Sequence, residues 1–266
     1  MGNNHHMLKE TLQWLSKIRL IDDELMTKFF ENNIECTELV VQIVLERTDI
    51  KVQQVHTQHH IKNLQGRSVI LDIHAVDGEG KQYNIEIQRS DQGAIPKRAR
   101  FHSSVLDSNS LEAKQDYSQL PETYVIFITE HDVLKGNLPI YHIDRTVRET
   151  GECFGDEAHI IYVNGEYKDD TPLGLLMKDF FCTKPEDMHY QQLADRLRYF
   201  KEEKEGVEEM SELMEAMCNE VGKRMVKEMA QKLLKGENMS CEKVSEYSNL
   251  PLEEVREMAK EMQVCH

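Results

Sequence analysis

Two acidic residues, Asp72 and Glu86, each interrupt a short apolar run that has the composition of a β-strand. The runs are "VILDI" and "YNIEIQ", and the glycine-containing turn "DGEGK" separates them. Strand packing alone favours an apolar side chain at both positions, and two carboxylates brought together repel each other. A fold that places them side by side needs a compensating positive charge, which a bound cation usually supplies. The alternative is that each acid lies on the exposed face of a two-sided strand.

Side-chain alternation decides whether the two acids can meet. Asp72 and His74 share one face of their strand, and Glu86 and Gln88 share one face of the next. If these faces coincide across the hairpin, Asp72 meets the Glu86–Gln88 region, and the apolar neighbours face the core: Leu71, Ile73, Ile85 and Ile87. Magnesium prefers oxygen ligands, so Asp72, Glu86 and the backbone carbonyl of Ile87 would form part of a metal shell. Such an ion lowers the pKa of a bound water and stabilises charge that develops on a phosphate.

The pattern around this hairpin predicts an α/β core. Residues 8–48 have helical spacing of apolar residues, and from about residue 51 the period changes to two, which predicts three strands. A helix over "PKRARFHSSVLDSNSLE" and a buried strand over "ETYVIFITE" follow, with shorter strands near "PIYHIDR" and "HIIYVNG". The resulting order of helix, three strands, helix and strand predicts a mixed sheet, in a domain that ends near Phe181.

The composition changes from Lys184 onward. Strong helix formers dominate as far as Gly236, with charges of both signs at helical spacing. This pattern predicts a solvated helix that packs on one face, and it is consistent with a homodimer through the C-terminal helices. The tail predicts two short helices joined at "SNLP"; its acidity favours a packing unit over a DNA-reading helix-turn-helix. We therefore divide the chain into residues 1–183 and 184–266.

Composition limits the class of protein. The net charge of −16 argues against general nucleic-acid binding, although it leaves room for a local basic face. No run approaches the length of a membrane span, and the N-terminus lacks the apolar segment of a signal peptide. Because the sequence shows no secretion signal, we expect a cytoplasmic protein with reduced thiols. The cysteines are far apart and form no CxxC pair, which argues against a structural zinc site: Cys36, Cys153, Cys182, Cys218, Cys241 and Cys265.

Four histidines lie on the first two predicted strands. Strand alternation separates His59 from His56 and His60, so these three form no compact set of metal ligands, and we expect them on the surface. His74 lies on the face of Asp72. It could contact a substrate or be a partly buried, hydrogen-bonded histidine, and the sequence leaves both readings open.

The acidic hairpin resembles the PD-(D/E)XK nuclease superfamily, and more closely the branch of nuclease-family transposases or recombination-promoting nucleases. Glu86-Ile87-Gln88 matches the E-x-Q form of the motif on the third strand of that branch. Arg98 in "RARFH" matches the arginine of R-x-x-Y-Y, whereas Phe101 and His102 depart from the tyrosines. Upstream, "DDELMTKFF" resembles the D-x-x-F-K-x-x-F opening, matched at Asp23 and Phe30 but not at Met26.

The resemblance implies a restriction-endonuclease-like core of order αβββαβ with a C-terminal helical extension. It also implies a metal-dependent endonuclease that hydrolyses phosphodiester bonds of DNA, linked to recombination or a mobile element. Magnesium would be the cofactor, with manganese as an alternative. No Ser, Tyr or Cys stands in the acidic hairpin as a nucleophile would, so hydrolysis would proceed without a covalent intermediate.

The resemblance also implies roles for individual residues. Asp72 and Glu86 would bind the metal, Gln88 would orient the attacking water or a phosphate oxygen, and Glu38 would complete the shell. The basic residues that follow would contact the phosphate backbone: Lys97, Arg98 and Arg100. Gln88 lacks the charge of the motif's lysine, which predicts slow turnover. The alternative is a weak or inactive nuclease fold that acts as an interaction or oligomerisation module.

Overall fold

The computed structural model describes residues 11–61, 68–236 and 239–262. Contacts divide this part of the chain into two compact units. The larger is Gln13–Lys201, and the smaller contains the residues from Glu202 onward together with Thr11 and Leu12. This division lies beyond residue 183 because helix α6 (Gln191–Glu202) packs within the larger unit. In that unit the rings of Phe29 and Phe200 lie 6.5 Å apart, and Arg196 donates to the backbone carbonyl of Phe29.

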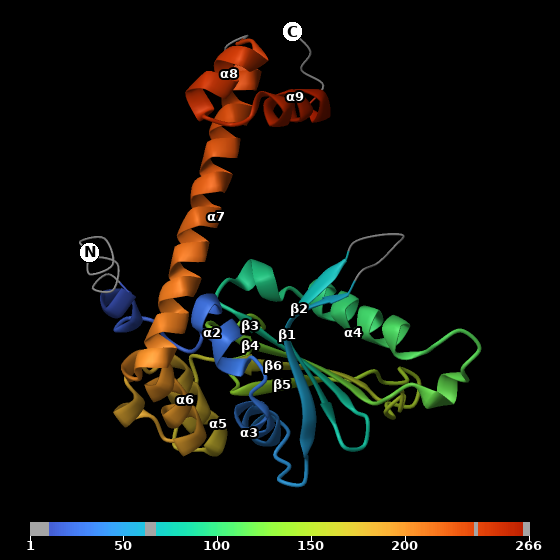
Figure 1. Ribbon diagram of the computed structural model, residues 1–266. Helices are drawn as coiled ribbons and strands as arrows, with labels where there is room; N and C mark the ends of the chain where they lie inside the picture. Colours follow the sequence, from blue (N-terminus) through green and yellow to red (C-terminus); the bar gives the residue numbers. More distant parts are fainter. Residues whose placement is uncertain (1–10, 62–67, 237–238, 263–266) are drawn as a thin grey trace. The chain divides into compact units, whose positions relative to one another are not determined.

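A mixed six-stranded sheet forms the centre of the larger unit (Figure 1). The strands follow the spatial order β1-β2-β3-β4-β6-β5. β2 pairs antiparallel with both β1 and β3. β3, β4 and β6 run parallel, and β5 is antiparallel to β6. The strands are β1 (Val52–Ile61), β2 (Val69–Asp77), β3 (Gln82–Gln88), β4 (Thr123–Thr129), β5 (Ile140–Ile143) and β6 (Ala158–Asn164).

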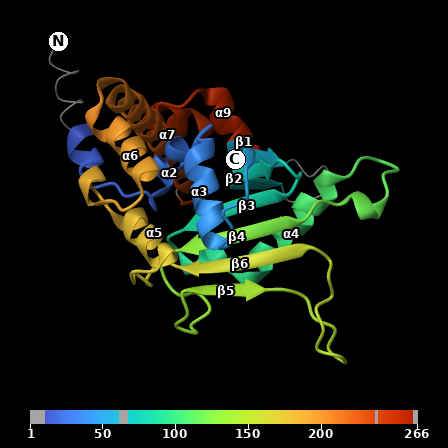
Figure 2. The ribbon, with the colours of Figure 1, turned by 90° about the horizontal axis from the view of Figure 1, so that it is seen from below.

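Helices cover both faces of this sheet. Parallel neighbours need a crossover connection, and α4 (Pro96–Ser110) provides it between β3 and β4. Pro96 begins α4, where its missing N–H costs nothing and its fixed φ suits a helix. Figures 1 and 2 show α4 on one face of the sheet and α3 and α5 on the other. The other elements of this unit are α2 (Asp23–Phe30), α3 (Ile34–Val44), α5 (Pro172–Phe181) and three short 3₁₀ helices, Asp91–Ala94, Tyr117–Gln119 and Pro185–Asp187.

An apolar cluster holds α4 against the sheet. Leu71 of β2, Phe127 of β4 and Tyr162 of β6 pack there with Ala99 of α4. The rings of Phe127 and Tyr162 stack 5.3 Å apart, and the Tyr162 hydroxyl donates to the carbonyl of Ala94 over 2.9 Å. This bond joins the 3₁₀ turn before α4 to strand β6.

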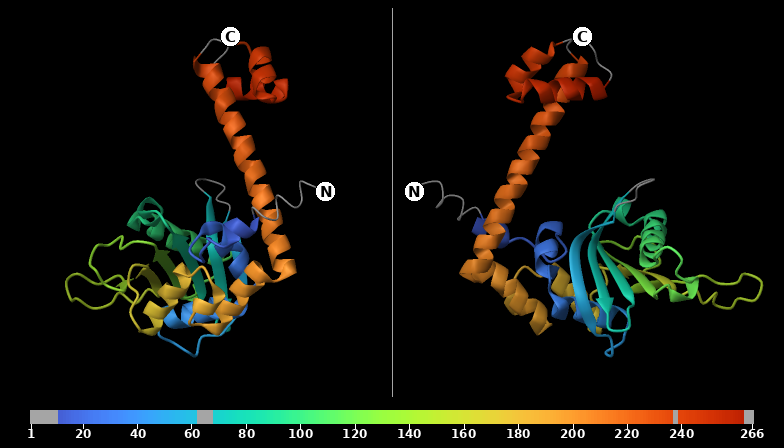
Figure 3. Two further views of the ribbon diagram at one scale, coloured as in Figure 1. Left: turned by 90° about the vertical axis from the view of Figure 1, so that its left-hand side faces the viewer. Right: turned by 45° about the vertical axis from the view of Figure 1, so that its right-hand side comes forward.

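The smaller unit is helical, as Figure 3 shows for its long helix and the two short ones at its end. It contains α7 (Lys204–Gly236), α8 (Cys241–Ser248) and α9 (Leu252–Glu261). Ala230 and Leu234 of α7 are buried with Val244 of α8 and Val255 of α9. Asn249 ends α8 in the left-handed conformation with a φ of 58°, which asparagine tolerates better than most residues.

The predicted fold class is confirmed. The helices α2 and α3, the strands β1–β3, the helix α4 and the strand β4 follow one another in the expected order, and the helical C-terminal part is also present. The two short terminal helices meet at "SNLP" as predicted, with Pro251 at the N-cap of α9. In the described ranges no helix has both the length and the apolar character needed to cross a bilayer.

Candidate active site

The two acids of the hairpin lie where β2 and β3 stop pairing. The antiparallel ladder between these strands begins at Ile73 and Ile85, one position past Asp72 and Glu86. At the two acids, hydrogen bonds from backbone N–H groups to the carboxylates replace the backbone hydrogen bonds between the strands. The backbone N–H of Asp72 donates to Oε1 of Glu86 over 3.3 Å, and the backbone N–H of Ile87 donates to Oδ2 of Asp72 over 3.2 Å. The predicted meeting of Asp72 with the Glu86–Gln88 region is therefore present in the structure.

Gln88 connects the acids to the first turn of α4. Its Nε2 donates to Oδ2 of Asp72 over 3.2 Å, and its Oε1 accepts from Nη1 of Arg98 over 3.2 Å. Gly93 allows this arrangement, because a Cβ at position 93 would overlap Oε1 of Gln88. The same Arg98 nitrogen donates to the carbonyl of Gly93 over 2.8 Å. Gly93 was not among the predicted site residues, although its place in the turn after the E-x-Q motif is a signal for it.

Arg98 neutralises the buried acid. Its Nη2 lies 2.9 Å from Oε2 of Glu86, whose side chain is fully buried. Its Nε donates to Nε2 of His102 over 3.3 Å. Nδ1 of His102 lies 3.3 Å from Oε1 of Glu86, and the amide of Asn84 lies 3.2 Å from the same nitrogen. His102, which departs from the tyrosine of the resembling motif, therefore contacts the acid directly.

Burial and like charge make Asp72 a weak acid in the folded chain. Desolvation, with the neighbouring charge of Glu86, raises the pKa of Asp72 from 3.8 to about 7, although the Ile87 N–H and Arg98 act in the opposite direction. Asp23 adds to the increase. Functional sites often contain a carboxyl group whose pKa is shifted toward neutrality in this way.

Asp23 is the upstream acid close enough to influence this site. It lies in the first turn of α2, and burial raises its pKa. Its charge acts on both Asp72 and Arg98. The resemblance had matched Asp23 to the family's opening motif, but we had not given it a role at the acids.

Glu38, the candidate for that upstream role, lies elsewhere. Its carboxylate accepts from the backbone N–H of Val52 over 3.0 Å and from Nζ of Lys51 over 2.8 Å. It also accepts from Nε2 of Gln42 over 3.1 Å. These contacts join α3 to the start of β1, and the structure does not bring Glu38 to the other site residues.

The three basic residues of α4 divide between two cavities. Lys97 and Arg98 line a cavity of about 680 Å³ together with Ile70, Phe101 and His102. Arg100 lines a different cavity, of about 280 Å³, beside strands β5 and β6. The structure therefore brings Lys97 and Arg98 to the acidic hairpin and turns Arg100 away from it.

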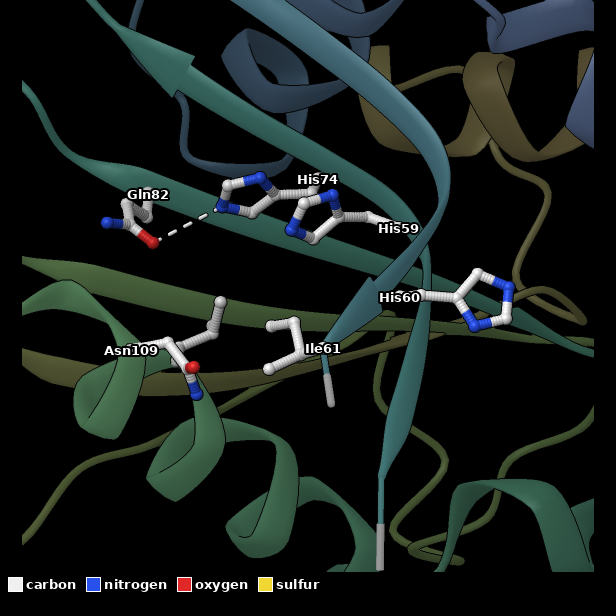
Figure 4. Close-up of a pocket in the computed structure, with 7 residues that line it drawn as sticks. His59, His60, Ile61, His74, Gln82 and Asn109 are labelled. Atoms are coloured by element: carbon white, nitrogen blue, oxygen red, sulfur yellow. Dashed lines mark hydrogen bonds between the residues drawn. The ribbon is translucent and has the colours of Figure 1, made fainter. Parts of the chain in front are cut away.

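A third cavity, of about 260 Å³, lies beside β1 and contains His59, His60, His74, Gln82 and Asn109 (Figure 4). His74 donates from Nε2 to Oε1 of Gln82 over 3.2 Å, while its buried Nδ1 has no partner among the residues that the structure describes. Desolvation lowers the pKa of His74. His74 is thus a partly buried, hydrogen-bonded histidine.

The prediction that strand alternation separates His59 from His56 is wrong. Their rings lie 5.9 Å apart, and His59 stacks on His74 with 5.1 Å between ring centroids. Gln58, between them, has a φ of 49°, which interrupts the extended conformation and turns His59 toward its neighbours. In the described ranges no group of three or more His, Cys, Asp or Glu side chains is arranged to hold a metal.

The acidic hairpin nevertheless has the donor chemistry of a hard cation site. Asp72 and Glu86 contribute carboxylate oxygens. The N–H and C=O of one strand residue point to the same side. Because the Ile87 N–H donates to Asp72, its carbonyl also faces the gap between β2 and β3. These oxygens fit magnesium or manganese, with water or substrate completing the shell.

The fold and this pair of strand-borne acids define a protein of the nuclease type. The family model described as "PD-(D/E)XK nuclease family transposase" matches residues 31–243, which is more than half of the chain, so the chain belongs to that family. The matched range includes the hairpin, all six strands and α7. Comparison with curated proteins and with solved structures found no match.

Proposed function

We propose that this protein is a metal-dependent endonuclease that hydrolyses phosphodiester bonds of DNA, with magnesium as cofactor and manganese as an alternative. One observation carries the proposal. Asp72, Glu86, Gln88 and Arg98 contact one another at the point where β2 and β3 separate, beside a cavity large enough for a phosphodiester. Family membership supports the nuclease class.

Asp72, Glu86 and the backbone carbonyl of Ile87 would hold the metal, and Asp23 lies near enough to contribute through its charge. When bound, the metal supplies a nucleophilic water at neutral pH and stabilises charge on the phosphate. Asp72 must lose its proton to serve as a ligand, so metal binding is expected to weaken below about pH 7.

The remaining residues position the substrate. Gln88 presents an amide beside Asp72, where it can orient the attacking water or a phosphate oxygen. Arg98 is one-third exposed, so its guanidinium can contact a phosphate while one nitrogen stays on Glu86. Lys97 is exposed on the same cavity and adds a second positive charge.

A second candidate function rests on the same arginine. Arg98 already neutralises Glu86 and bonds to Gln88, so the site keeps its charge balance without a cation. A fold stabilised in this way could serve as an interaction or oligomerisation module, with catalysis weak or lost.

Cleavage of supercoiled plasmid separates the two functions. We expect nicking that requires magnesium or manganese, stops with chelator and disappears in Asp72→Ala. Glu112→Ala is the matched control, because that acid is exposed at the end of α4 and far along the chain from the hairpin. A purified wild type that neither cleaves nor binds magnesium by calorimetry would support the interaction module.

Substitutions on two faces of α4 test whether DNA binds at the hairpin. Lys97→Ala removes a charge from the cavity at the hairpin, whereas Arg100→Ala removes an equal charge from the other cavity. We expect only Lys97→Ala to weaken duplex binding in a fluorescence-anisotropy titration, by about three- to tenfold, with a shallower salt dependence. Equal losses in both variants would place the DNA elsewhere.

We assign catalysis to the residues predicted as the nuclease domain, 1–183, and a supporting role to residues 184–266. The family's description as a transposase favours a role in recombination or at a mobile element. A cytoplasmic location agrees with the free thiols of the described cysteines: Cys36, Cys153, Cys182, Cys218 and Cys241. A chain that ends after α6 (Gln191–Glu202) keeps the packing of this helix in the larger unit and removes α7, α8 and α9. Retention of plasmid nicking by this chain would support a supporting role for the three removed helices.

A further inference from the structure

The middle of α7 has no buried side chains among the residues that the structure describes. From Ser211 to Met229, nineteen consecutive residues, no side chain is buried. Large apolar residues nevertheless follow each other at every fourth position in this stretch, and three of them are widely exposed. Val221 is 43%, Met225 63% and Met229 43% exposed. Helices in water stay stable chiefly by packing an apolar face, so such a stretch is expected to have a partner.

The apolar and small residues of this stretch form two neighbouring rows along the helix. The first row is large: Leu213, Met217, Val221, Met225 and Met229. The second row is mostly small: Met214, Cys218, Gly222 and Val226. It ends at Ala230, which is buried against α8 and α9. The other two rows of the same stretch are largely charged or polar. Rows with four-residue spacing are the ridges and grooves by which two helices most often pack, at a crossing angle of about −50°.

Gly222 marks the centre of the small row. A glycine inside an exposed helix costs about 1 kcal/mol relative to alanine. Apart from the backbone of its own helix, no residue that the structure describes comes within 4 Å of the place where its Cβ would be, so no contact among these residues requires a glycine there. The absence of a side chain at Gly222 leaves a groove beside Val221. The ridge of side chains of a second helix that crosses at this point would fit into this groove.

The charge of α7 changes sign at the same place. From Lys204 to Glu220, six acids accompany one lysine; from Val221 to Gly236, five basic residues accompany one acid. The helix dipole favours such a bias only within the first and last turns, whereas here it extends over the whole helix. Two parallel copies would place like charges together. Two antiparallel copies would place the acidic half of each along the basic half of the other.

We propose that α7 forms a homodimer in which two copies cross antiparallel, with the two-fold axis at Val221. In this register Met217 of each chain lies opposite Met225 of the other, and the large ridge of each enters the groove at Gly222 of its partner. A single helix crossing buries a small area, so the dimer forms at micromolar concentration. The interface uses residues of α7 alone and does not depend on the proposed nuclease activity.

Cysteine cross-linking of the full chain tests the geometry, with the exposed Cys153 and Cys218 changed to serine. We expect Val221→Cys to form a covalent dimer under mild oxidation. Met217→Cys and Met225→Cys should each stay monomeric alone and cross-link when mixed. Cross-linking of Met217→Cys with itself would indicate a parallel pair and overturn the antiparallel crossing.

Light scattering during gel filtration tests the dimer itself. The wild type should have about twice the chain mass of 31.1 kDa at about 100 μM. Val221→Glu should raise the dissociation constant at least a hundredfold, because two like charges would meet at the axis. Asn219→Glu, which places the same side chain on a polar row, is the matched control and should remain dimeric. A monomeric wild type, or equal loss in both variants, would overturn the proposal.

Discussion

The Asp72→Asn variant is expected to unfold less readily than the wild type above pH 7 when metal is absent. Burial and the charge of Glu86 raise the pKa of Asp72 from 3.8 to about 7. Between these two values the folded chain keeps the Asp72 proton while the unfolded chain has lost it. The free energy of unfolding therefore falls as the pH rises through this window, and becomes level above about pH 7. Asparagine has no charge to bury and keeps an oxygen for the Ile87 N–H.

The size of the effect follows from the pKa. Each pKa unit corresponds to about 1.4 kcal/mol, so the full window is worth about 4 kcal/mol. Between pH 5 and pH 8 the advantage of Asp72→Asn over the wild type should grow by about 2–3 kcal/mol. The pKa of about 7 already includes the attraction between ionised Asp72 and Arg98, so no separate correction is needed, and the difference between the two pH values is the quantity to measure.

Urea unfolding in the presence of chelator is the assay. Trp14, the chain's single tryptophan, belongs to the larger unit and reports on its unfolding. Glu112→Gln, at an exposed acid, should show no pH-dependent difference. Magnesium should stabilise the wild type and leave Asp72→Asn unchanged. If Asp72→Asn and the wild type differ by the same amount at pH 5 and pH 8, the carboxyl ionises normally and the argument from burial is wrong.

Three further variants test the contacts around the acids. Arg98→Ala leaves Glu86 buried without its nearest cation and should cost about 3 kcal/mol of unfolding free energy at pH 8; stability equal to wild type would mean that another group neutralises the acid. Gly93→Ala should displace the flexible side chain of Gln88, lowering plasmid nicking at least tenfold while urea unfolding changes little. Glu38→Gln should lose about 1 kcal/mol of stability yet nick within about twofold of wild type, and a selective loss of nicking would return Glu38 to the site.

The sequence was sufficient for the fold because the signals were local. Three elements can each be predicted from their own residues. The signals are the change from helical to alternating spacing near residue 51, the glycine turn after β2, and the proline that begins α4. The order of these elements then leaves few ways to form a mixed sheet, since β3 and β4 are parallel and need α4 as a crossover. The C-terminal helices followed from composition in the same way.

The site was only partly predictable because tertiary contacts complete it. Asp72, Glu86 and Gln88 lie on two strands joined by a short turn, so alternation alone brought them together. Glu38 and Asp23 lie on helices whose position relative to β2 depends on packing across the sheet, so the motif match at Asp23 did not by itself show that its charge reaches the acids. His59 was misplaced because strand alternation assumes an extended chain, and one left-handed residue breaks that assumption.

Arg98 makes the charge balance of this site unusual for a metal centre. Its guanidinium donates to one oxygen of Glu86, to Gln88, to the carbonyl of Gly93 and to His102, so four acceptors hold it in place. A cation that binds Asp72 and Glu86 must share Glu86 with this arginine. Repulsion between the two positive charges lowers the affinity of the site for the cation. Because Arg98 is one-third exposed, a phosphate in the adjacent cavity can accept a hydrogen bond from one of its N–H groups. The phosphate then adds negative charge between Arg98 and the cation. Metal and DNA are therefore expected to bind more tightly together than either does alone.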